Sequence, residues 1–96
     1  HPEVYRSALV GVGPRGRQEP VIVIERAGKR RSSKRRLADA LFLLASSSDH
    51  TSAIETLIFH DAFPVDARHN AKIRREELGR FAERMIASKR VWRRMS

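Results

Sequence analysis

The stretch Phe63–Ile73, Phe-Pro-Val-Asp-Ala-Arg-His-Asn-Ala-Lys-Ile, determines the expected arrangement of this chain. A hydrophobic segment ends at Pro64, a polar loop follows, and Lys72 stands near the end of that loop. Apolar residues at helical spacing come next: Leu78, Phe81, Ala82, Met85 and Ile86. We therefore predict a strand over about residues 55–60, a loop, and a helix from about residue 71 to residue 88.

Three further elements precede this stretch. Residues 4–12 alternate between two faces as a half-buried strand does, and Pro20–Glu25 is continuously apolar and β-branched, which is typical of a central strand. A helix is expected from a serine cap near Ser33 to about Ser47. Its apolar stripe should contain Leu37, Leu41, Leu44 and Ala45, widened by Ala38 and Phe42. The order of elements predicts an α+β domain, a three-stranded sheet with helices packed on it.

Composition limits the possible functions. The chain has 96 residues, which suits one domain or a detached part of a larger enzyme. Its formal net charge of +9 would attract phosphate-bearing partners or the acidic face of another domain. It has no cysteine, which excludes thiolate metal sites and suits a reducing cytosol, so we expect a cytoplasmic protein. No apolar run approaches the ~20 residues of a membrane span. The start at His1, without methionine, is interpreted as a cut edge.

The segment around Lys72 resembles the closing signature of the acyl-adenylate-forming enzymes, the AMP-dependent synthetase/ligase superfamily. That signature has a proline, a polar loop, Gly-Lys, Ile or Val, then a basic residue and a leucine. The matching positions here are Pro64, Lys72, Ile73, Arg75 and Leu78. Two features depart from the pattern, because Ala71 replaces the usual glycine and the loop is about two residues longer than in most members.

The resemblance implies a fold and a role. In that superfamily the signature lysine lies on a small, mobile C-terminal domain and reaches into an active site built mostly by a larger N-terminal domain. Residues 1–96 would then be a single C-terminal lid domain without its hinge and N-terminal domain, and inactive alone. Lys72 would be catalytic in acyl-AMP formation. ATP and Mg²⁺ would be bound mainly by the N-terminal domain of the same polypeptide, which is the implied partner.

A subgroup resemblance refines this expectation. Phe63–Asp66, Arg68–Ile73 and the opening residues 1–13 are similar to the β-lactone synthetases of bacterial long-chain olefin biosynthesis. Such enzymes activate a β-hydroxy fatty acid with ATP, and the hydroxyl of the acid then closes the lactone. Other enzymes of the olefin pathway would be further partners. The alternative within the superfamily is the C-terminal domain of a long-chain fatty acyl-CoA synthetase.

Three loop residues are candidates for contacts with substrate or phosphate. Arg68 could meet a phosphate or an acidic patch, and it could equally be a solvated loop residue. His69 could act as a base toward the hydroxyl, although a lone loop histidine is seldom catalytic. Asn70 more simply caps the following helix or occupies a tight turn.

Two other functions are weighed against this reading. Four acidic or histidine residues lie in or near the loop: His60, Asp61, Asp66 and His69. They lack the spacing of metal ligands, so no metal site is expected within the chain. The basic run Lys29–Arg36 fits nucleic-acid binding. Because aromatic residues are few and no nucleic-acid motif is present, we interpret the run as a solvated basic loop or, failing that, a docking surface.

Overall fold

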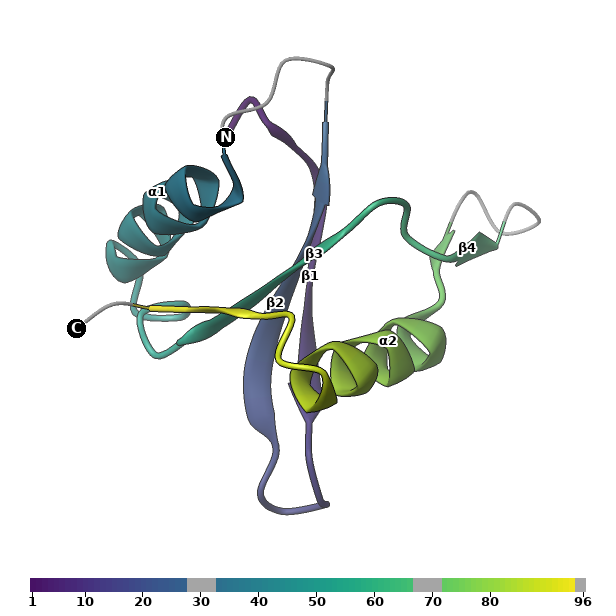
Figure 1. Ribbon diagram of the computed structural model, residues 1–96. Coiled ribbons are helices and arrows are strands. Elements are labelled where there is room, and N and C mark those ends of the chain that lie inside the picture. The colour runs from purple at the N-terminus through teal and green to yellow at the C-terminus, as the bar shows by residue number, and fades with distance from the viewer. Residues whose placement is uncertain (28–32, 67–71, 95–96) are drawn as a thin grey trace.

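The computed structural model describes residues 1–27, 33–66 and 72–94. Four strands form one mixed sheet in the order β1-β2-β3-β6, and β4 and β5 form a separate two-stranded pair. The two helices cover opposite faces of the sheet (Figure 1). The elements are β1 (Val4–Val12), β2 (Glu19–Arg26), α1 (Lys34–Ser46), β3 (Thr56–His60), β4 (Val65–Asp66), β5 (Lys72–Ile73), α2 (Arg75–Ala87) and β6 (Trp92–Arg93). The predicted α+β class is confirmed.

The first two predicted strands are both present and form a hairpin. β1 and β2 are antiparallel, with Ala8 opposite Val23 and Val10 opposite Val21. These residues face α2 and are buried, whereas Leu9 on the other face of β1 is half exposed. β2 then pairs with β3 in parallel, and α1 supplies the crossover between them. β2 is therefore a central strand, as its unbroken apolar sequence predicts.

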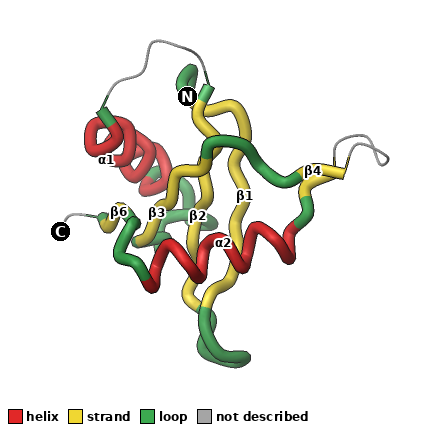
Figure 2. The backbone as a smooth tube through the Cα atoms, turned by 45° about the vertical axis from the view of Figure 1, so that its right-hand side comes forward, coloured by secondary structure: helices red, strands yellow, loops and turns green. Residues whose placement is uncertain are grey.

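Each helix builds one layer of the core. Leu78 and Ala82 of α2 pack on the β1–β2–β3 face with Ile58, and Figure 2 shows α2 crossing that face. Leu37, Ala38 and Phe42 of α1 pack on the opposite face. The predicted cap is confirmed, because the Ser33 hydroxyl accepts a hydrogen bond from the Arg36 N–H.

The prediction for Leu44 was wrong. Leu44 is 55% exposed, because the buried side of α1 centres on Ala38 and Phe42 and leaves Leu44 at its margin. The sequence places Leu44 within the apolar stripe, but the buried residues of α1 are Leu37, Ala38 and Phe42.

The prediction of three strands was also wrong, since β6 adds a fourth. Trp92 pairs with Leu57 and Arg93 with Thr56. The Arg93 guanidinium holds this strand in place through Glu19, at 2.7 Å, and through the Thr56 hydroxyl. Two residues are too few to show alternation, so tertiary contacts create this strand.

The start of the second helix required a correction as well. α2 begins at Arg75, not near residue 71, because Lys72 and Ile73 pair with Asp66 and Val65. Lys72 therefore lies in a strand and not in a first helical turn. No helix in the described ranges has both the length and the hydrophobicity to cross a bilayer.

Candidate functional site

The β4–β5 hairpin determines where the predicted catalytic lysine lies. The backbone of Lys72 is opposite Asp66 in this hairpin, and Ile73 is opposite Val65. β4 projects away from the main sheet, beyond the start of α2 (Figures 1 and 2). The other three candidates, Arg68, His69 and Asn70, lie outside the described residues.

Both ends of the hairpin are fixed to the core. Phe63, directly before it, is 4% exposed and packs in the α2 layer. Ile73, at its other end, packs against the same layer. The Arg74 N–H donates to the Pro64 carbonyl oxygen at 2.8 Å, which holds the two ends side by side. The base of the hairpin is thus preorganised by the fold.

The start of α2 is tied to β1. The Arg75 guanidinium donates to the carbonyl oxygen of Leu9 at 3.1 Å, and the Arg74 guanidinium pairs with Glu77 at 3.0 Å. Glu76 and Glu77 lie in the first turn, where negative charge complements the helix dipole. The N-cap position is Arg74, so the suggestion that Asn70 caps this helix was wrong, and the alternative of a tight turn at Asn70 lies outside the described residues.

A partly buried ion pair lies beside Phe63. The Arg6 Nε donates to one Glu25 carboxylate oxygen at 2.6 Å, and its terminal nitrogen donates to the other at 3.1 Å. The Arg6 guanidinium also lies 5.7 Å from the centre of the Phe63 ring. The hydrogen bond from Arg6 to Glu25 is the main reason that the pKa of Arg6 is raised.

This pair did not emerge from sequence reasoning, although a signal for it exists. Arg6 shares the inward face of β1 with Ala8, and Glu25 shares the inward face of β2 with Val23. Opposite charges at apolar positions of two adjacent strands indicate a buried pair, because neither charge could be buried alone.

His60 also packs near the Phe63 ring. Its ring lies 4.0 Å from the Phe81 ring and 5.9 Å from the Phe63 ring. Its Nδ1 accepts a hydrogen bond from the Ala62 N–H at 3.0 Å. Burial lowers the pKa of His60, with Asp61 opposing the shift, so the imidazole is neutral at pH 7. Within the described ranges, no group of three or more His, Asp or Glu side chains could hold a metal ion.

Part of the basic run Lys29–Arg36 helps to hold the fold together. Lys34, Arg35 and Arg36 lie in the first turn of α1, as predicted, and Ser33 is its N-cap. Residues 29–32 of the run lie outside the described residues. The Arg35 guanidinium lies over the Trp92 ring at 5.2 Å and donates to the Arg93 carbonyl oxygen at 3.3 Å. Arg35 therefore fixes β6 to α1 and is not a solvated loop residue.

Comparison with known proteins gives two relatives of much greater length. The chain is 45% identical over 83 residues to an olefin beta-lactone synthetase from Xanthomonas campestris pv. campestris, a match that covers 85% of this chain and 15% of that protein. It is 43% identical over 79 residues to an olefin beta-lactone synthetase from Stenotrophomonas maltophilia, covering 82% of this chain and 14% of that protein. No family model matches the chain. No solved structure matches it significantly.

Proposed function

We propose that this chain is the C-terminal domain of an ATP-dependent ligase that adenylates a β-hydroxy fatty acid on the way to a β-lactone. The identity of 45% to a protein named olefin beta-lactone synthetase is the observation that supports this most. The match covers 83 of the 96 residues, so a continuous match includes the segment Val65–Ile73 at whichever residue the match begins. Lys72, in that segment, is the proposed catalytic residue.

The lysine would act on charge that develops during adenylation. When a carboxylate attacks the α-phosphorus of ATP, two anions approach each other and negative charge builds on the non-bridging oxygens. A positioned ammonium offsets that charge, which is worth several kcal/mol of barrier in a site that excludes water. Lysine suits this role because its compact charge sits on a long stem that domain closure can bring into position.

The fold supports this role through the base of the hairpin. Phe63 and Ile73 are packed in the core, and the hydrogen bond from Arg74 to Pro64 joins the two ends. A base that is fixed to the core would hold the backbone of Lys72 in place, which would reduce the entropy lost when the domain closes. The partly buried Arg6–Glu25 pair helps to hold Phe63, because the Arg6 guanidinium lies 5.7 Å from the centre of the Phe63 ring.

The chain contributes little to the binding of ATP and Mg²⁺ in this proposal. Mg²⁺ is usually held by carboxylates and phosphate oxygens, and the described residues offer no acidic cluster for it. The larger, N-terminal part of the polypeptide would hold both, and Mg²⁺ would neutralise phosphate charge there. Lys72 would add the final cation from this domain.

The full-length protein tests the proposal directly. It is incubated with ATP, Mg²⁺ and a β-hydroxy fatty acid, with and without coenzyme A, while AMP release and the acyl product are followed by chromatography and mass spectrometry. AMP and a β-lactone formed without coenzyme A would support the proposal. A thioester formed only with coenzyme A would assign a fatty acyl-CoA synthetase instead, and no AMP under either condition would refute adenylation. The matched fatty acid without the β-hydroxyl should form acyl-adenylate and no lactone.

A further inference from the structure

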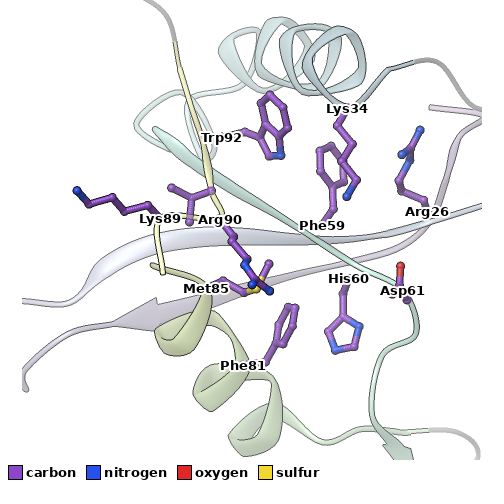
Figure 3. Close-up of a pocket in the computed structure, with 11 residues that line it drawn as sticks. Arg26, Lys34, Phe59, His60, Asp61, Phe81, Met85, Lys89, Arg90 and Trp92 are labelled. Carbon is purple, nitrogen blue, oxygen red and sulfur yellow. The ribbon is translucent and has the colours of Figure 1, made fainter. Parts of the chain in front are cut away.

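A pocket of about 610 Å³ opens between the start of α1 and the end of α2 (Figure 3). Its volume is within the range of roughly 300–1,000 Å³ that small-molecule sites occupy. None of its lining residues belongs to β4 or β5, so it is separate from the proposed adenylation function. The lining residues come from five segments: Arg26, Lys34, Phe59–Asp61, Phe81 with Met85, and Lys89–Trp92.

The pocket exists because β6 is short. β6 pairs with Thr56 and Leu57 only. Among the described residues, the outer edge of β3 has no strand partner beyond Leu57, and Phe59 and His60 line the pocket at this edge. α1 and α2 cover opposite faces of the sheet and leave the edge open between them.

Two cations enter the pocket from different segments, Lys34 from the first turn of α1 and Arg90 from the loop between α2 and β6. Figure 3 shows the Lys34 ammonium beside Phe59 and the Arg90 guanidinium beside Met85. In the described part of the chain, neither cation has an ion pair with a carboxylate, whereas Arg35 and Arg93 both have one. The pocket therefore presents two basic groups whose charge the fold does not neutralise.

The other charges leave the pocket with a net positive charge. Arg26 and Lys89 also line it, Arg26 is paired with Glu3 at 3.7 Å, and Asp61 is the one acidic residue among the described lining residues. His60 adds no charge at pH 7, because burial lowers its pKa. Lys89 points away from the centre of the pocket in Figure 3, so Lys34 and Arg90 are the cations that matter for a bound ligand.

The rest of the lining is apolar and largely flat. Phe59 and Trp92 meet edge to face with ring centres 6.3 Å apart, and Phe81 lies against His60. Met85 fills the space beside Phe81 (Figure 3). Aromatic rings and a thioether provide a surface for a ring or an acyl chain, and not for a fully hydrated ion.

We infer that this pocket binds an organic phosphate, with its phosphate between Lys34 and Arg90 and its apolar group against Phe59, Phe81 and Met85. A phosphomonoester carries about −1.5 to −2 charges at pH 7 and three acceptor oxygens, so it can satisfy two cations that approach from two sides. A carboxylate carries one charge and matches this pair less well. Nucleoside phosphates and phosphate-bearing amphiphiles share this chemistry.

Binding of phenyl phosphate to the 96-residue chain tests the inference, followed by calorimetry and by two-dimensional NMR. Phenyl phosphate combines a phosphomonoester with a flat ring, while inorganic phosphate and phenol carry one part each. We expect saturable binding of phenyl phosphate, with shifts at Phe59, Phe81 and Arg90, and weaker binding of both partial ligands. AMP and dodecyl phosphate, below its micelle concentration, then distinguish a nucleotide from an amphiphile as the source.

Three matched variants localise the binding. Lys34→Gln and Arg90→Gln each remove one cation from the pocket and should weaken phenyl phosphate binding about tenfold or more. Arg80→Gln removes an exposed cation of α2 that does not line the pocket, and it should leave the affinity within about twofold. Circular dichroism and thermal unfolding establish that the variants are folded. Equal weakening in all three variants, or no saturable binding to the wild-type chain, would overturn the inference.

Discussion

Phe63 anchors the hairpin that carries Lys72, and its truncation should destabilise the domain substantially. The ring is 4% exposed and packs in the α2 layer, with His60 at 5.9 Å and the Arg6 guanidinium at 5.7 Å. Replacing a buried phenylalanine by alanine costs about 3–5 kcal/mol, since apolar burial is lost and a cavity remains. We expect Phe63→Ala to cost about 3 kcal/mol, at the lower end of this range.

Urea unfolding of the 96-residue chain, followed by circular dichroism, measures this loss. The control is Tyr5→Ala, because Tyr5 is an aromatic residue of β1 that is 65% exposed. Its truncation should change the free energy of unfolding by less than about 0.5 kcal/mol. Similar losses for the two variants, or a loss below about 1 kcal/mol for Phe63→Ala, would refute the view that Phe63 ties the hairpin to the core.

Three smaller predictions concern stability. Lys89 has a φ of 60°, in the left-handed region that favours glycine. Lys89→Gly should therefore raise the free energy of unfolding in urea by about 0.5–1 kcal/mol. A lower free energy of unfolding would contradict this account of the helix end. Because burial lowers the pKa of His60, protonation favours the unfolded chain; stability should therefore fall as the pH drops below about 6.5, and the fall should be smaller in His60→Gln than in the wild type or in the exposed-site control His50→Gln. Arg35→Gln removes the cation over Trp92 and should cost about 0.5–1 kcal/mol and shift Trp92 fluorescence to longer wavelength; no change in either would leave β6 without the proposed anchor.

The longer elements could be predicted because their patterns extend over several residues. The alternation in β1, the continuous apolar run in β2 and the helical spacing in α2 each repeat often enough to identify one kind of structure. The short strands could not be predicted in this way. β6 depends on the contact of Arg35 with it and on the contact of its own Arg93 with Glu19. The β4–β5 pair depends on a register that two residues per strand do not reveal.

The candidate site divides in the same manner. Lys72 emerges from the resemblance of its segment to a known signature, whereas from its own residues it is one basic side chain among twenty. The sequence predicted that Lys72 lies at the start of a helix, and only the structure shows that it lies in β5. The pocket beside β3 could not be predicted at all, since its lining residues, Lys34 of α1 and Arg90 of the loop after α2 among them, come from segments that are far apart in sequence.

The rate of acyl-adenylate formation by Lys72→Ala in the full-length protein tests the central claim most directly. The lysine is proposed to stabilise charge that forms in the transition state, so the variant should bind ATP nearly as well as the wild type. Single-turnover adenylation, measured by rapid quench with labelled ATP, should be slower by about 10²–10³, which corresponds to about 3–4 kcal/mol. An adenylation rate close to that of the wild type would contradict the claim and assign the neutralisation of the phosphate to another group.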